Sequence, residues 1–174
     1  VDSYFGGIAG EATVTQCNSV VNCVVGSNTS KNVGGLAGYF RNEGNQVVTY
    51  SLNRYVKANS CQNTEVTGSA NVGGLIGKLT AEAYGITDNY SNANVKAIFR
   101  SDSPSNTGRY AGGIFGYVSN GVNFRGLYFA GTVTADKYWA GGIVGYMNGS
   151  YGDATRQLLM LGTVKAEAEY ANGS

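Results

Sequence analysis

The sequence predicts an all-β protein, a repetitive β-solenoid or β-helix-like stack of about five units. Two observations carry this prediction. A glycine-rich motif recurs five times, and each copy is followed by a segment in which apolar and polar residues alternate. Repeats built from strands and turns are typical of stacked arrays, because one unit alone cannot bury its apolar face. No convincing long helical pattern interrupts the repeats.

The first motif reads Gly-Gly-aliphatic-x-Gly, and its copies begin 28, 39, 39 and 29 residues apart. A phosphate-binding loop would need one copy that leads into a helix. Five copies in a strand-rich chain instead indicate structural glycines, placed where a neighbouring coil or a tight corner brings backbones together. These glycines are Gly6, Gly7, Gly10, Gly34, Gly35, Gly38, Gly73, Gly74, Gly77, Gly112, Gly113, Gly116, Gly141, Gly142 and Gly145.

The second motif is a strand that ends in Val-x-Ala in four of its five copies, 18 to 23 residues after each Gly-Gly pair. Val95 and Ala97 alternate with Asn94 and Lys96, which is the period of a strand with one buried face. We expect the valines to stack in one inward ladder: Val24, Val56, Val95, Val133 and Val164. A second ladder is expected from Ile8, Leu36, Leu75, Ile114 and Ile143.

Length and composition limit the possible functions. With 174 residues, we interpret 1–174 as a single repeat domain, a fragment or processed part of a larger protein. The net charge of +1 argues against a nucleic-acid partner. The chain contains no histidine, the commonest general base and a frequent zinc ligand. No apolar run approaches about 18 residues, so we expect no membrane insertion within this chain.

Catalysis is not expected. β-Solenoids also carry polysaccharide lyases and hydrolases, but those need clustered carboxylates, or calcium with a basic residue. The acidic residues considered share no column of the repeat: Glu43, Glu65, Glu82, Asp88, Asp102, Asp136 and Asp153. Aligning the repeats places Cys17, Thr49, Gly126 and Gln157 at the positions equivalent to Asp88. We therefore predict a non-enzymatic protein without a metal or cofactor.

The two linked motifs resemble the GLUG repeat. The glycine motif followed by NYSNANVKA (residues 89–97) or LYFAGTVTA (residues 127–135) is similar to this repeat. It occurs in bacterial surface proteins, including adhesin-like proteins and the non-catalytic regions of IgA-specific metallopeptidases. The resemblance spans about residues 6 to 166, although the first two units depart from the pattern. It implies an extracellular, β-rich module used for adhesion or as a spacer, without catalytic residues.

Aromatic residues flank several glycine motifs. The position two residues before each Gly-Gly holds Tyr4, Asn32, Asn71, Tyr110 and Trp139, and Tyr39, Tyr117 and Tyr146 directly follow three of the motifs. Stacked rings on a solvent face can bind sugars or proteins, but they can also be a structural ladder between coils. The candidate ligand-binding residues are Tyr110, Tyr117, Tyr138, Trp139 and Tyr146. The segment Lys137–Gly142 is the best single candidate, because it holds the only tryptophan.

Three further features leave alternatives open. The positions that follow the valines hold Val25, Lys57, Lys96, Thr134 and Lys165, which form either a basic stripe for acidic glycans or, as we favour, a solvated face. Cys17, Cys23 and Cys61 are an odd number. Cys17 and Cys23 lie roughly 20 Å apart in an extended chain, too far for a disulfide, and a pair between Cys61 and one of them would need a neighbouring coil in register, so we favour free thiols. Asn28, Asn89, Asn148 and Asn172 begin Asn-x-Ser/Thr triplets, whose use depends on the host.

The leading hypothesis is a bacterial cell-surface module for adhesion, or a structural stalk. Its partners would be a host protein, a glycan or other copies of itself. The alternatives are a carbohydrate-binding module that uses exposed Tyr and Trp, and a self-assembling surface or filament subunit, since open solenoid ends can pair edge to edge. The longest loops, around residues 41–47 and 100–107, are the expected sites of variable surface chemistry.

Overall fold

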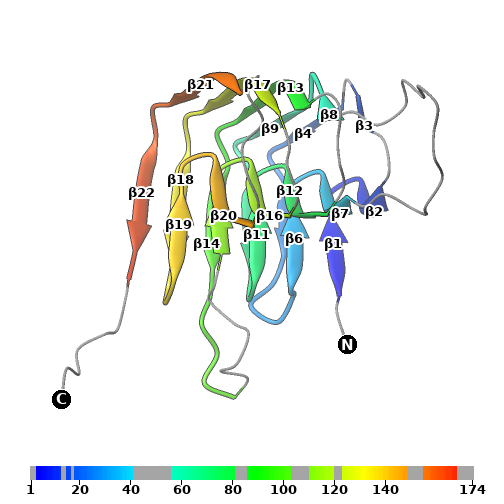
Figure 1. Ribbon diagram of the computed structural model, residues 1–174. Coiled ribbons are helices and arrows are strands. Elements are labelled where there is room, and N and C mark those ends of the chain that lie inside the picture. Colours follow the sequence, from blue (N-terminus) through cyan, green and yellow to red (C-terminus); the bar gives the residue numbers. More distant parts are fainter. Residues whose placement is uncertain are drawn as a thin grey trace.

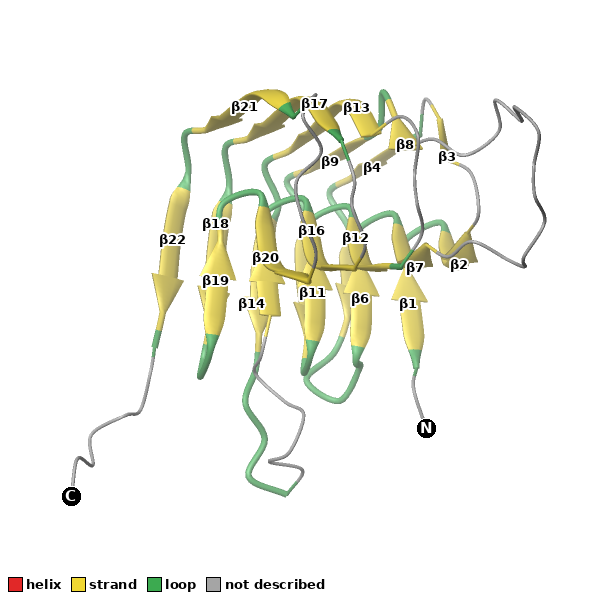
Figure 2. Cartoon of the chain, in the orientation of Figure 1, coloured by secondary structure: helices red, strands yellow, loops and turns green. Residues whose placement is uncertain are grey.

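The computed structural model is a stack of five coils, and strands from all five coils build four parallel sheets (Figure 1). It describes residues 3–12, 15–16, 18–40, 56–80, 86–102, 110–119, 123–148 and 155–167, with the side chains of 15 and 16 left aside. The described chain contains strands, turns and loops and no helix (Figure 2). The predicted fold class, an all-β solenoid-like stack, is confirmed.

Each coil passes through the four sheets in the same order. Sheet A holds β1 (Tyr4–Gly6), β6 (Asn32–Gly34), β11 (Asn71–Gly73), β15 (Tyr110–Gly112) and β19 (Trp139–Gly141). Sheet B holds β2 (Ala9–Ala12), β7 (Ala37–Phe40), β12 (Ile76–Leu79), β16 (Phe115–Ser119) and β20 (Val144–Asn148). Sheet C holds β3 (Thr15–Gln16), β4 (Ser19–Val21), β8 (Val56–Lys57), β9 (Ser60–Gln62), β13 (Ile86–Ser91), β17 (Phe124–Phe129) and β21 (Arg156–Met160). Sheet D holds β5 (Val24–Gly26), β10 (Glu65–Gly68), β14 (Asn94–Ala97), β18 (Thr132–Ala135) and β22 (Thr163–Ala166).

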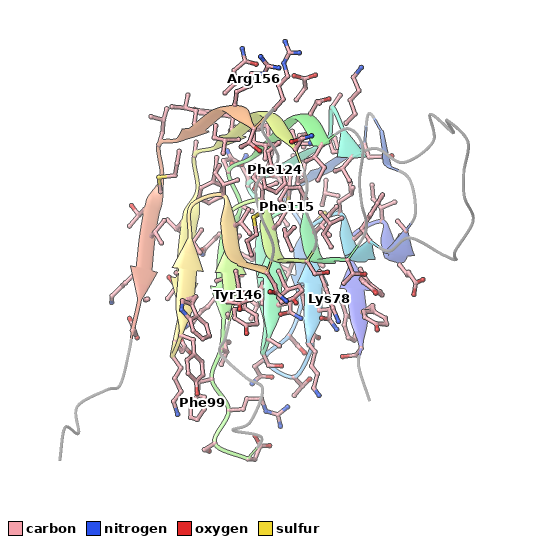
Figure 3. The ribbon with its side chains drawn as sticks, in the orientation of Figure 1. Lys78, Phe99, Phe115, Phe124, Tyr146 and Arg156 are labelled. Carbon is pink, nitrogen blue, oxygen red and sulfur yellow. The ribbon has the colours of Figure 1, made fainter. Side chains whose placement is uncertain are left out.

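The core consists of columns in which equivalent side chains from successive coils lie above one another. Leu36, Leu75 and Ile114 are buried one above the next, as the sequence predicts for the glycine motif. Ile8, in the first coil, is exposed. The rings of Phe115 and Phe124 stack between sheets B and C with centroids 5.6 Å apart (Figure 3). Apolar burial along these columns is the main source of stability.

The valine column differs from the prediction in the first two coils. Val66 pairs with both Val25 and Val95, and the column continues through Val133 and Val164. Val56 lies instead in sheet C, where it pairs with Ile86. The expected members Val24 and Val56 were therefore wrong. The second coil carries a long segment, residues 41–55, ahead of sheet C, so a constant distance from the Gly-Gly pair selects the wrong strand.

The length of the corner between sheets C and D also differs between coils, by one residue, and this changes the position of the valine column in the sequence. In the first two coils the corner contains one extra residue, Asn22 or Asn63, with φ of 53° and 48°. Asparagine is one of the few residues that readily adopt this left-handed conformation. A second left-handed bend crosses sheet C at Ala58, Asp88 and Gln157. Ala58 is exposed there, whereas the alternation pattern would bury it.

The three glycines of each motif form the corner between sheets A and B, and in the second coil each excludes a side chain for a different reason. A Cβ on Gly34 would lie 2.0 Å from the carbonyl oxygen of Ala37 across the turn. A Cβ on Gly35 would meet the sulfur of Cys61 at 2.4 Å, and one on Gly38 would meet the backbone nitrogen of Phe5 at 2.3 Å. The close approach of backbones inferred from the repeats is therefore present at this corner.

Candidate functional site

The candidate site lies on the outer side of the corner between sheets A and B. Two columns of outward side chains meet there, one from each sheet. The sheet A column is Tyr4, Asn32, Asn71, Tyr110 and Trp139. The sheet B column is Glu11, Tyr39, Lys78, Tyr117 and Tyr146. Both columns follow from the distance of each residue to the glycine corner, so local sequence spacing fixes them. We call this surface the outer corner.

The structure brings all five predicted ligand-binding side chains together in one aromatic cluster in the fourth and fifth coils. Its members are Tyr110, Tyr117, Tyr138, Trp139 and Tyr146. Tyr110 is central: its ring centroid lies 5.3 Å from that of Trp139, 4.7 Å from that of Tyr146 and 5.7 Å from that of Tyr117. Tyr138 stacks on Trp139 at 5.3 Å. Residues from two sheets and two coils thus form one continuous surface.

The cluster is half open to solvent. Trp139 is 48% exposed, and the four tyrosines are partly buried. Figure 3 shows Tyr146 and Lys78 on the outer side of the stack, while Phe115 and Phe124 lie inside it. Because the core is already filled by other side chains, the cluster does not seal the interior. Rings that hold one another in place lose little further conformational freedom when they bind a ligand.

Polar side chains continue the outer corner toward the first coils. The Asn71 amide donates a hydrogen bond to the Asn32 carbonyl oxygen (2.6 Å between Nδ2 and Oδ1). Lys78 places its Nζ atom 5.4 Å from the ring centroid of Tyr39, a cation–π distance. Tyr39 also stacks on Tyr4 at 4.9 Å. The corner therefore presents aromatic surface, then an amide and an ammonium group, then a second aromatic pair.

The predicted basic stripe is not a single column. Val25 is buried in the valine column, and Lys57 lies in sheet C, where it pairs with Thr87. The positions that follow the true valines are Gly26, Thr67, Lys96, Thr134 and Lys165. Lys96 lies 3.9 Å from Asp136, and Lys165 hydrogen-bonds Glu167, which raises the pKa of Lys165 and lowers that of Glu167. The paired lysines suit the solvated face that we favour.

Cys23 and Cys61 are free thiols in the structure, and Cys17 lies outside the residues whose side chains are described. Cys23 is exposed. Cys61 is fully buried between Val20 and Ser91 in sheet C. Burial raises the pKa of the Cys61 thiol to about 11, and the hydrogen bond with Thr64 offsets part of this effect. Cys61 is therefore a neutral core residue at physiological pH.

The part of the chain that the structure describes holds no candidate metal site. No group of three or more Cys, Asp or Glu side chains there could hold a metal ion. Asp88 and its equivalents do form a column, as expected, but Ala58 occupies the position for which Thr49 was predicted. Residues 41–55 and 103–109, which include most of the two predicted loops, lie outside the described residues. Among the residues that the structure does describe, no helix is long and apolar enough to cross a membrane.

One predicted modification site is closed by the fold. Asn89 is buried, and its side-chain oxygen accepts hydrogen bonds from the backbone and side-chain nitrogens of Asn59 at 3.1 and 3.0 Å. A glycan cannot be attached to this amide in the folded chain. Asn28 lies exposed in a turn, Asn148 is exposed at the end of β20, and Asn172 lies outside the described residues.

Sequence reasoning missed an aromatic pair that lies away from the outer corner, on sheet C. Tyr90 and Tyr128 stack on the outer face of sheet C, with ring centroids 5.0 Å apart. Both residues stand five positions before a valine of the sheet D column, and this shared spacing could have revealed them. The pair lies on a different sheet from the aromatic cluster. A variant of this pair can therefore serve as a control for variants of the cluster.

Comparison with protein-family models, curated proteins and solved structures finds no match to this chain. The resemblance to GLUG repeats consequently remains a sequence-based expectation, and function has to be argued from the geometry described above.

Proposed function

We propose that this chain is a non-enzymatic recognition module of a bacterial cell-surface protein, displayed outside the cell and used for adhesion. The aromatic cluster is the observation that supports this proposal. Its rings lie on the outer surface, are held by one another and are partly exposed. Tyrosine and tryptophan surfaces of this kind are enriched in binding sites. The GLUG resemblance supplies the expected cellular setting.

The stack of coils serves this function as a rigid support. Each coil holds its outward side chains at a fixed place relative to the next coil, because parallel pairing in register continues through all four sheets. A site built on such strands is better organised in advance than one built on a long loop. Stalk and binding surface are therefore compatible roles of the same chain.

An adhesion assay tests the proposal. Beads coated with the purified chain are applied to surfaces coated with mucin or extracellular-matrix proteins. We expect specific attachment that falls when Trp139 and Tyr110 are both replaced by alanine. Tyr128→Ala is the matched control, since it removes an equally stacked ring from sheet C. Equal attachment by both variants, or no attachment by a folded wild-type chain, would contradict the proposal.

A self-assembling subunit is a second candidate, supported by the apolar side chains of the fifth coil. Leu158, Leu159, Leu161 and Val164 are exposed there. Among the described residues, no strand pairs with the outer edges of β19, β20, β21 and β22. Such an edge can accept strands of a second copy. Sedimentation over a range of concentrations tests this role: growing assemblies would support it, and a monomer throughout would exclude it.

A further inference from the structure

We propose that the ligand of the aromatic cluster is an extended carbohydrate chain that lies along the outer corner, parallel to the axis of the stack. One end of the chain contacts Trp139 and Tyr110, and the other reaches Asn71 and Lys78. This inference rests on the recognition role proposed above. It adds a ligand class, an orientation and a set of residues that contact successive sugar rings.

The chemistry of the cluster favours a carbohydrate. Four phenol hydroxyl groups and the indole N–H can hydrogen-bond, while the ring surfaces contact apolar C–H groups. The described residues of the two columns carry no charge in the fourth and fifth coils. A sugar ring presents the same combination of hydroxyl groups and apolar C–H patches. Binding to this neutral aromatic part therefore requires no desolvation of charge, and Lys78 of the third coil is the one charged side chain that the proposed ligand contacts.

The repeat of the stack favours a linear polymer. Equivalent residues of neighbouring coils lie about 4.8 Å apart. A pyranose ring, measured from one glycosidic oxygen to the next, is about as long as one coil is high. Successive sugars can therefore meet equivalent positions of successive coils. An extended polypeptide has a shorter repeat and would drift out of step with the columns.

The neighbouring coil provides the polar contacts that such a chain needs. Asn71 follows Tyr110 in the sheet A column, and Lys78 follows Tyr117 in the sheet B column. The Asn71 side-chain nitrogen donates one of its hydrogens to Asn32. The side-chain oxygen of Asn71 takes no part in that bond and can accept a hydrogen bond from a sugar hydroxyl group. Hydroxyl groups of a third sugar would bind these two side chains, beyond the two sugars above the aromatic cluster.

The single tryptophan of the chain provides a direct test, because its fluorescence reports the proposed site. The probes are β-1,4-linked glucose, β-1,4-linked N-acetylglucosamine and N-acetyllactosamine oligosaccharides, each from two to six rings. We expect saturable fluorescence changes with at least one series. Affinity should rise from two to three rings and then level off, because a chain of about three rings spans the aromatic cluster and the coil of Asn71 and Lys78.

Two variants separate this arrangement from a local stacking site. Asn71→Ala should weaken the binding of the three-ring probe about tenfold and leave the two-ring probe unchanged. Tyr110→Ala should weaken both probes about tenfold or more. Tyr128→Ala should change neither. Equal affinity for all lengths, or an Asn71→Ala effect on the two-ring probe alone, would overturn the proposed orientation.

Periodate treatment of the adhesion surface distinguishes failure of this inference from failure of the proposed function. Periodate cleaves vicinal diols of glycans and leaves most of the protein intact. Attachment that depends on Trp139 and Tyr110 should disappear after treatment when the bound sugars carry vicinal diols, as β-1,4-linked glucose and terminal galactose do. If it persists, and all oligosaccharides are silent, the ligand is a protein and the carbohydrate proposal is wrong while the recognition role stands. If no surface is bound at all, the recognition role itself fails.

Discussion

Individual glycines determine how closely the strands of this protein can fold at the corner between sheets A and B. Gly38 faces the backbone of the preceding coil, and an added Cβ would lie 2.3 Å from the Phe5 nitrogen. Gly10 occupies the same position of the motif in the first coil, where the nearest atom, the Tyr4 carbonyl oxygen, is 3.1 Å away. Backbone atoms cannot rotate aside as a side chain can, so the two positions should tolerate a methyl group differently.

Gly38→Ala should lower the free energy of unfolding by about 3 kcal/mol or more, as expected for overpacking against backbone. Gly10→Ala should lower it by about 1 kcal/mol or less. Urea denaturation of both variants and the wild type measures the difference. Similar losses in the two variants would show that the preceding coil is not the cause.

Cys61 gives the stability of the protein a specific dependence on alkaline pH. Its thiol has a pKa of about 11 in the folded chain against an ordinary value of 9.0, mainly because of burial. The folded state therefore disfavours the thiolate. The contribution of the neutral Cys61 thiol to the free energy of unfolding is complete below pH 9 and is lost as the pH rises toward 11. The expected loss is roughly 2 to 3 kcal/mol.

The comparison of wild type with Cys61→Ala isolates this effect, because tyrosines and lysines titrate in both proteins. The difference in unfolding free energy between the two should shrink between pH 9 and pH 11. A difference that stays constant over that range would mean that the Cys61 thiol is accessible to water in the folded chain.

At the scale of an element, the strands of sheet C in the first three coils are held by a ladder of asparagines, of which Asn59 and Asn89 are buried and Asn18 is partly buried. Asn18, Asn59 and Asn89 lie above one another in the first three coils, and Leu127 and Leu158 continue the column. The Asn89 amide nitrogen donates to the carbonyl oxygens of Val56 and Thr87 at 2.8 and 3.0 Å. The ladder satisfies backbone groups next to the left-handed bend, where regular strand pairing is interrupted.

Asn89→Ala should lower the free energy of unfolding by about 3 kcal/mol, because it leaves buried donors and acceptors without partners. Asn92→Ala is the matched control. Asn92 also bonds another asparagine twice, Asn63, but at the surface (2.7 and 3.2 Å). Water can replace those bonds, so the expected loss is about 1 kcal/mol or less. Equal losses in chemical denaturation would contradict a special role for the buried ladder.

The success of sequence reasoning varied between elements for a physical reason. Strands of sheets A and B adjoin the glycine corner, so their columns, including that of Tyr110 and Trp139, follow from counting along the chain. Sheets C and D lie beyond segments of variable length. Their register depends on pairing with other coils. The Val-x-Ala pattern at Val56 suggested the sheet D strand of the second coil, but Val56 lies in sheet C and the sheet D strand contains Val66. The same error hid the asparagine ladder.

For the whole molecule, the aromatic cluster illustrates how a stack converts sequence spacing into a surface. Tyr110 and Trp139 are 29 residues apart in the chain, yet their rings are in contact. The candidate residues could be predicted as a group because the repeat supplies their alignment. Their ligand could not, since a surface of stacked rings accepts several kinds of partner. Binding measurements on Trp139 and Asn71 therefore carry the decisive information.

The order of strands within the sheets also determines how the molecule responds to force. The first and fifth coils occupy opposite ends of every sheet, and the hydrogen bonds between coils run along the line that joins them. Tension applied across the stack would load the bonds of one terminal coil at a time. With 28 to 39 residues between successive motifs, each release would add roughly 100 to 140 Å of chain. Optical-tweezer records should show a staircase of such extensions, and a tether of this kind would lengthen under flow while its inner coils stay folded.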